Sequence, residues 1–195
     1  MNDIILTDIS KSFDGKKVLK DVSVSFGTGQ TVCIRGRSGI GKTTLLRIIA
    51  GLTEPDSGTV TGVPERIGFV FQEDRLCEDF SALSNIRLVT GRALPKEQII
   101  QHLEELELAE SALQPVRGFS GGMKRRVALA RAICADPDLL ILDEPFKGLD
   151  PDLRLRVIDY IKKHTEGKTV ICVTHDVSEA MYMGAVIIDL DDRLQ

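Results

Sequence analysis

Short apolar runs alternate with helical patterns along most of the chain. Runs rich in β-branched residues predict strands at residues 4–9, 18–26, 31–35, 59–63 and 66–71. Further runs predict strands at residues 139–142, 169–174 and 185–190, and helical patterns occupy residues 43–50, the segment after Pro151 and a short segment before Ala185. This alternation favours an α/β fold with a mostly parallel core sheet covered on both faces.

Two segments depart from this alternation. The two opening strands are separated only by turn residues around Asp14 and Gly15, so we expect an antiparallel β flap beside the core sheet. Residues 82–136 are mainly helical, with Ile99, Leu103 and Leu106 at helical spacing after Pro95. We therefore expect one domain over residues 1–195. Residues 1–72 and 137–195 would form its α/β core and flap, and about 73–136 an inserted helical subdomain.

The composition fits a globular protein of one domain. The 195 residues suffice for one sizeable core, and 43% hydrophobic against 28% charged residues allow the chain to fold. A net charge of −4 argues weakly against a dedicated nucleic-acid binder. Apolar runs are too short to cross a bilayer and the start lacks a secretory signal, so we expect a cytosolic location.

The four cysteines and two of the three histidines carry no clear signal for chemistry. Cys33, Cys77, Cys134 and Cys172 are widely spaced without a C-x-x-C pair, which favours buried, reduced thiols over disulfides or metal ligands. His102 and His164 fall on charged helical segments, where we expect them to be solvated.

A phosphate-binding loop is the strongest motif. Residues 36–43, Gly-Arg-Ser-Gly-Ile-Gly-Lys-Thr, fit G-x-x-x-x-G-K-[ST] between a predicted strand and a predicted helix. Glycines let successive N–H groups turn toward phosphate oxygens, and the helix N-terminus attracts the anion. Lys42 is placed for the β- and γ-phosphates and Thr43 for Mg²⁺. The residues expected to contact a nucleotide here are Gly36, Arg37, Ser38, Gly39, Ile40, Gly41, Lys42, Thr43 and Thr44.

An acidic pair follows an apolar strand at residues 139–142. Ligands of open α/β sheets bind at the carboxyl ends of strands, which is where Asp143 and Glu144 would lie. Asp143 is expected to hold Mg²⁺, and Glu144 to polarise the water that attacks the γ-phosphate.

A second anion site is suggested by Ser120, Gly121 and Gly122 at the start of another helix. Taken alone, these residues also fit an ordinary helix cap with a glycine turn. One chain has no use for two γ-phosphate sites unless they serve different active sites. Two copies arranged head to tail would bring the Ser120 loop of one copy to the nucleotide of the other.

Together these motifs resemble an ABC-type ATPase, the nucleotide-binding subunit of ABC transporters, over essentially the whole chain. Residues 36–43 match Walker A, residues 120–122 the signature motif, and Asp143 with Glu144 match Walker B and its catalytic carboxylate. The resemblance implies four further roles. These are an adenine-stacking Phe13, a Q-loop Gln72 that contacts Mg²⁺ and the attacking water, a D-loop Asp150 and a switch His175 at the γ-phosphate.

Some residues depart from the family pattern. Phe119 and Met123 stand at the two ends of the signature motif, and such a Met is familiar in importer ATPases similar to those for nitrate, sulfonates and taurine. Lys147 occupies a position that is usually small, where it would face phosphate or an acidic partner, or slow closure. The helical subdomain is short, and we expect no C-terminal regulatory domain.

The resemblance implies a function and its partners. We expect an ATPase that dimerises around MgATP and drives a membrane permease, most simply in a bacterial importer, on the cytoplasmic face of the membrane. Residues 73–87 are the expected permease-docking surface, and no nucleic acid is expected. The alternative is a non-transport ABC ATPase acting on nucleic acid or ribosomes. Only the basic residues 124–131 favour this alternative. A regulatory module that binds nucleotide without turnover is a third possibility, which Lys147 leaves open.

Overall fold

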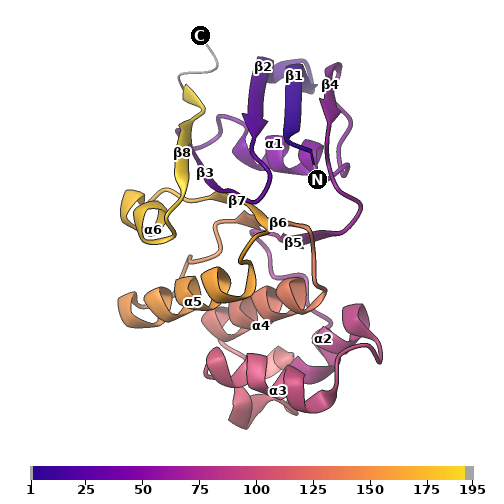
Figure 1. Cartoon of the computed structure of the whole chain (residues 1–195), viewed down its shortest axis with the longest axis vertical. Coiled ribbons are helices and arrows are strands. Elements are labelled where there is room, and N and C mark those ends of the chain that lie inside the picture. The colour runs from indigo at the N-terminus through magenta and orange to yellow at the C-terminus, as the bar shows by residue number, and fades with distance from the viewer. Residues whose placement is uncertain (1, 192–195) are drawn as a thin grey trace.

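The core of the protein is a five-stranded parallel sheet (Figure 1). The structure is a computed structural model that describes residues 2–191, so residue 1 and residues 192–195, the two ends of the predicted domain, lie outside it. The strands lie in the order β5 (Ile67–Val70), β6 (Leu139–Asp143), β7 (Thr169–Val173), β3 (Thr31–Arg35) and β8 (Val186–Asp189). Every neighbouring pair is parallel, as the sequence predicts.

Both faces of this sheet are buried at its central strands, which explains the continuous apolar runs of those strands. In β6, Leu139 and Ile141 pack into the core on one face, whereas Leu140 and Leu142 pack into the core on the other. Side chains of a strand alternate between faces, so each core receives every second residue. This double burial fixes the register of β6, because a shift by one residue would carry Asp143 into an apolar core.

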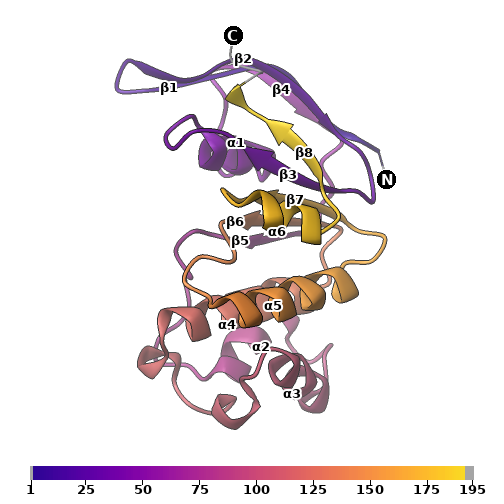
Figure 2. The ribbon, with the colours of Figure 1, turned by 90° about the vertical axis from the view of Figure 1, so that its left-hand side faces the viewer.

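An antiparallel sheet covers one side of the core. It consists of β2 (Lys16–Phe26), β1 (Ile4–Phe13) and β4 (Ser57–Thr61), and helix α1 (Lys42–Ile49) lies between it and the parallel sheet (Figures 1 and 2). The predicted flap is therefore present, with β4 as its third strand. This strand begins and ends two residues earlier than the predicted range of 59–63, because its pairing with β1 runs from Ser57 to Thr61.

Helices cover the other side. Helices α4 (Gly121–Cys134), α5 (Pro151–His164) and α6 (Val177–Tyr182) lie next to the parallel sheet, and α2 (Ala82–Thr90) and α3 (Lys96–Glu105) lie beyond α4 (Figure 2). Two short 3-10 turns, η1 (Ala109–Ser111) and η2 (Val116–Gly118), link α3 to α4. None of the helices within residues 2–191 has both the length and the apolar character required to cross a bilayer.

Two of the four cysteines differ from the sequence prediction. Cys33 and Cys172 are buried neighbours in β3 and β7, as expected, and no cysteine within the described residues forms a disulfide. Cys134 is only partly buried, and Cys77 is exposed in the loop before α2. The prediction of a buried thiol was wrong for Cys77, because this loop lies on the surface.

The predicted solvation of His102 and His164 was also wrong. The two rings lie between α3 and α5, where His102 Nδ1 is 2.9 Å from the hydroxyl of Tyr160. His164 Nε2 is 3.0 Å from the carboxylate of Glu105. Helical spacing placed both histidines on polar faces, but packing of α3 against α5 removes much of their contact with water.

Burial makes His102 a source of pH-dependent stability. It lowers the pKa of His102 below its ordinary value of 6.5, the positive charges of His164 and Lys163 act in the same direction, and Glu105 opposes them. The unfolded chain then binds a proton at His102 more readily than the folded chain does, so neutral His102 contributes to the free energy of unfolding. This contribution is complete above about pH 6.5 and is lost as the pH falls through the folded-state pKa.

We expect His102→Asn to be about 1 kcal/mol less stable than the native chain at pH 7.5. The difference should shrink by pH 5.5, because only the native chain loses the His102 contribution on acidification. Urea unfolding at the two pH values measures this effect. The same stability difference at both values would contradict the assignment to His102.

Candidate active site

The parallel topology brings four distant segments to one edge of the sheet. The loops after β3, β5, β6 and β7 carry the Gly36 loop, Gln72, Glu144 and His175 respectively. They meet at a cavity of about 240 Å³ at the carboxyl ends of the strands, the usual ligand position in such sheets. The predicted site residues that line it are Ser38, Gly39, Gly41, Lys42, Thr43, Thr44, Gln72, Glu144 and His175.

The loop between β3 and α1 has the form of an anion site. Gly41 immediately precedes α1 with φ of 105°, and a Cβ at this position would lie 2.7 Å from the side chain of Leu19. Only glycine therefore fits, both for its backbone conformation and for its space. No side chain caps the helix, so its first N–H groups remain available for an anion in the cavity.

Lys42 is held inside this loop. Its Nζ donates hydrogen bonds to the carbonyl oxygens of Gly36, at 2.7 Å, and Arg37, at 3.0 Å. Burial lowers the pKa of Lys42, while nearby carboxylates, first among them Glu144, act to raise it. The ammonium group is thus held against the backbone of the loop that is predicted to bind phosphate.

The oxygen atoms at the start of α1 and the end of β6 suit Mg²⁺. The Thr43 hydroxyl donates to Asp143 Oδ2 at 2.9 Å, and the amide of Gln72 lines the same cavity. Burial raises the pKa of Asp143, an effect that the Thr43 hydrogen bond opposes. No cluster of three His, Cys, Asp or Glu side chains in residues 2–191 has the arrangement of a metal site. The donors present fit Mg²⁺, which is usually held by one or two protein oxygens together with substrate phosphates.

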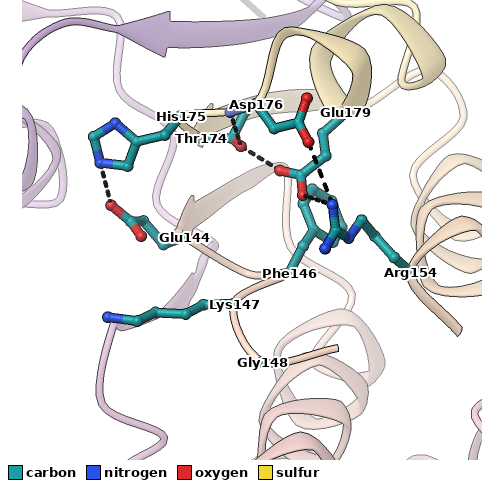
Figure 3. Close-up of a pocket in the computed structure, with 9 residues that line it drawn as sticks. All are labelled: Glu144, Phe146, Lys147, Gly148, Arg154, Thr174, His175, Asp176 and Glu179. Atoms are coloured by element: carbon teal, nitrogen blue, oxygen red, sulfur yellow. Dashed lines mark hydrogen bonds and ion pairs between the residues drawn. The ribbon is translucent and has the colours of Figure 1, made fainter. Parts of the chain in front are cut away.

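Glu144 and His175 both line the cavity, and their side chains lie against each other (Figure 3). Glu144 Oε1 is 2.7 Å from His175 Nε2. Glu144 has φ of 51°, an uncommon left-handed backbone conformation for this residue type, and its N–H donates to the carbonyl of Val173 on β7. This turn directs the carboxylate away from the end of β6 and toward the His175 loop.

A network of polar side chains that the sequence did not reveal supports the His175 loop. Thr174 donates to Glu179, and Arg154 lies 3.1 Å from Glu179 and 3.3 Å from Asp176 (Figure 3). Burial raises the pKa of Glu179, whereas its contacts with Thr174 and Arg154 lower it. The network joins α5 and α6 to the residues on both sides of His175.

The signature residues lie elsewhere. Ser120 caps α4 by accepting a hydrogen bond from the N–H of Met123, and Asp150 caps α5 by accepting one from the N–H of Leu153. With Gly121 and Gly122, they line a second cavity of about 490 Å³ that shares no lining residue with the first. One subunit therefore keeps its two predicted phosphate sites apart.

Besides the signature residues and Asp150, four predicted nucleotide contacts lie outside the first cavity, and one of them, Ile40, packs against the apolar core instead. Phe13, at the end of β1, is 47% exposed and does not line it. Gly36 and Arg37 border a neighbouring cavity of about 250 Å³, where Asp191 accepts hydrogen bonds from the N–H and Nε of Arg37. Nothing in the local sequence indicated that Asp191 would support the loop.

The basic residues 124–131 of α4 make contacts within the chain. Arg125 donates to the carbonyls of Phe71 and Gln72, and Arg126 donates to that of Leu106. Arg125 and Arg126 are both buried. Arg125 and Arg126, two of the basic residues that favoured a nucleic-acid partner, thus stabilise the Q-loop and the packing of α4.

Comparison with known proteins identifies the family. The model of the ABC transporter family matches residues 19–147. An aliphatic sulfonates import ATP-binding protein, SsuB 2 of Pseudomonas syringae pv. tomato, is 37% identical over 94% of this chain and 80% of its own length. SsuB 3 of Rhodococcus jostii is 39% identical over 97% of this chain and 71% of its own length. The chain belongs to the ABC transporter family.

Solved structures of similar fold support the same family assignment for this ABC protein. The dimeric bacterial ABC transporter cassette MJ0796 has a TM-score of 0.85 and 29% identity, covering 95% of this chain and 94% of its own. A post-hydrolysis state of MJ0796 bound to ADP and Pi has a TM-score of 0.83 and 30% identity over 92% and 90% of the two chains. The predicted family, the α/β fold, the ATPase activity and the use of ATP with Mg²⁺ are confirmed. The roles of individual residues remain predictions.

Proposed function

We propose that this protein is the ATP-hydrolysing subunit of a bacterial importer, and that two copies arranged head to tail enclose two MgATP and drive a membrane permease. The separation of the two cavities carries this proposal. The Gly36 loop and the Ser120 loop each present a helix N-terminus to an anion, yet they lie in different cavities of one subunit. A second copy brings them together, and the similar MJ0796 cassette is described as dimeric.

Different residues of the chain have different roles in the proposed hydrolysis. The Gly36 loop and Lys42 bind the phosphates, exchanging the carbonyl contacts of Lys42 for phosphate oxygens. Thr43, Asp143 and Gln72 hold Mg²⁺, which when bound neutralises charge on the phosphate oxygens. Glu144 accepts a proton from the attacking water, and His175 binds the γ-phosphate. Phosphoryl transfer depends mainly on alignment and electrostatics, so these contacts account for most of the rate.

The surface after Gln72 is the proposed permease-docking site. Phe80 is 46% exposed there, and Arg75 stacks over the ring of Phe71 at 3.9 Å. The carbonyl of Gln72 also accepts from Arg125 of α4, so this surface contacts both the nucleotide cavity and the helix that follows Ser120. Import is supported by the names of the relatives, and a permease partner places the protein on the cytoplasmic face of the membrane.

Affinity capture from detergent-solubilised membranes of the source bacterium tests the permease partner. We expect the native chain to retain a polytopic membrane protein, and Phe80→Asp to lose it while keeping ATP binding. Leu113→Asp is the matched control, because Leu113 is also exposed, at 66%, but lies outside residues 73–87. Capture of ribosomes or DNA in place of a membrane protein would support the non-transport alternative.

A further inference from the structure

Lys147 is a cation presented in a fixed position beside the catalytic pair. It follows Glu144 by three residues, and its N–H donates to the carbonyl of Glu144 at 3.4 Å. Phe146 and Leu149, on either side in the sequence, are buried, whereas Lys147 itself is exposed. The two apolar anchors hold the turn in place and leave the lysine at its surface.

The lysine lines two cavities, although it is not among the residues that line the nucleotide cavity itself. It lines a cavity of about 200 Å³ with Glu144 and His175, and it also lines the cavity of Ser120 and Gly122. In Figure 3 the Lys147 side chain extends below Glu144, and its ammonium group lies on the same side as the Glu144 carboxylate and the His175 ring. Glu144 and His175 also line the nucleotide cavity, so Lys147 is a neighbour of two residues at the edge of that cavity.

Within the part of the chain that the structure describes, the charge of Lys147 is not neutralised. Among residues 2–191, no acidic side chain forms an ion pair with its Nζ, and no hydrogen bond from it is present. Arg154, the other permanent cation of the same cavity, is by contrast paired with Glu179 and Asp176. An unpaired ammonium group beside a triphosphate site is suited to bind an anion there.

We propose that Lys147 binds the terminal phosphate of the ATP held by its own subunit. The ammonium group reaches the γ-phosphate from the side of Glu144, and Lys42 reaches it from the loop. This proposal rests on the proposed function, because it requires the γ-phosphate to lie beside Glu144 and His175. Lys147 would then distinguish ATP from ADP, because ADP lacks the γ-phosphate that Lys147 contacts.

The test measures ATP and ADP affinities by isothermal titration calorimetry. All variants also carry Ser120→Phe, which is expected to keep the protein monomeric, so that only the subunit's own Lys147 can reach the nucleotide. We expect Lys147→Met to weaken ATP binding about tenfold, the usual size for a charge-assisted contact, with ADP binding unchanged. Lys147→Arg should restore most of the ATP affinity, because it keeps the charge.

Lys96→Met is the matched control, since Lys96 is exposed at the start of α3, away from both cavities. Equal affinities of Lys147→Met and its parent for ATP, tighter ATP binding, or an equal loss for ATP and ADP would each overturn the proposal. The same titrations are repeated with Ser120 intact, and a loss of ATP affinity seen only there would assign Lys147 to the partner's nucleotide and overturn the proposal as well. A parent protein that binds no ATP would instead reject the proposed function.

Discussion

Glu144→Gln is expected to abolish ATP hydrolysis and to accumulate an ATP-bound dimer. Glutamine keeps the size of the side chain and its contact with His175, but it cannot accept a proton from the attacking water. Loss of a general base costs about 10² to 10⁴ in rate. Since hydrolysis is the step that reopens the proposed dimer, two subunits should stay closed around MgATP.

Size-exclusion chromatography with and without MgATP, alongside a phosphate-release assay, measures both effects. Glu166→Gln is the control, because Glu166 is an exposed acid in the loop between α5 and β7 that lines neither cavity. It should hydrolyse ATP like the native chain. A Glu144→Gln protein that stays monomeric and still hydrolyses ATP would contradict the assignment of Glu144.

Ser120→Phe is expected to reduce ATP turnover by at least about 100-fold without weakening ATP binding to the Gly36 loop. Ser120 caps α4 in the second cavity, so a bulky ring there blocks the approach of the partner's nucleotide. The subunit's own nucleotide cavity shares no lining residue with it and should remain intact. Steady-state hydrolysis and calorimetric ATP binding separate the two effects.

A mixture of two inactive variants tests the head-to-tail arrangement directly. Lys42→Ala removes the phosphate lysine but keeps Ser120, whereas Ser120→Phe keeps Lys42. A Ser120→Phe homodimer would carry the ring at both of its sites, whereas a heterodimer of the two variants carries it at one site and keeps Lys42 and Ser120 at the other. Hydrolysis by the mixture should therefore exceed that of either variant alone. Turnover by Ser120→Phe alone at the native rate would show instead that one subunit suffices.

Much of the candidate site could be predicted because its signals are local. The Gly36 loop requires glycines at fixed spacing and a lysine at the start of a helix, and all of these lie within eight consecutive residues. Asp143 and Glu144 follow directly from the end of an apolar strand. The helix starts at Ser120 and Asp150 are equally local, because a capping side chain bonds an N–H only three residues away.

Contacts between distant residues could not be predicted in the same way. Three sets of contacts join elements that are far apart in the sequence. They are the hydrogen bonds of Arg37 with Asp191, the Arg154 network beside His175 and the contact of His102 with Tyr160. For this reason the basic residues of α4 suggested a nucleic-acid surface, whereas Arg125 in fact donates to the Q-loop.

The sequence by itself determined the strand and helix order, the phosphate loop and the order of the family motifs, because backbone conformation and hydrophobic periodicity act over a few residues. Only the tertiary structure decided which side chains meet at the carboxyl edge of the sheet. It showed that the two predicted anion sites of one subunit lie in separate cavities and that Lys147, near Glu144, has no ion-pair partner among residues 2–191. These facts depend on how β6 and β7 pair and how α4 and α5 pack against them, and no local pattern encodes such long-range packing.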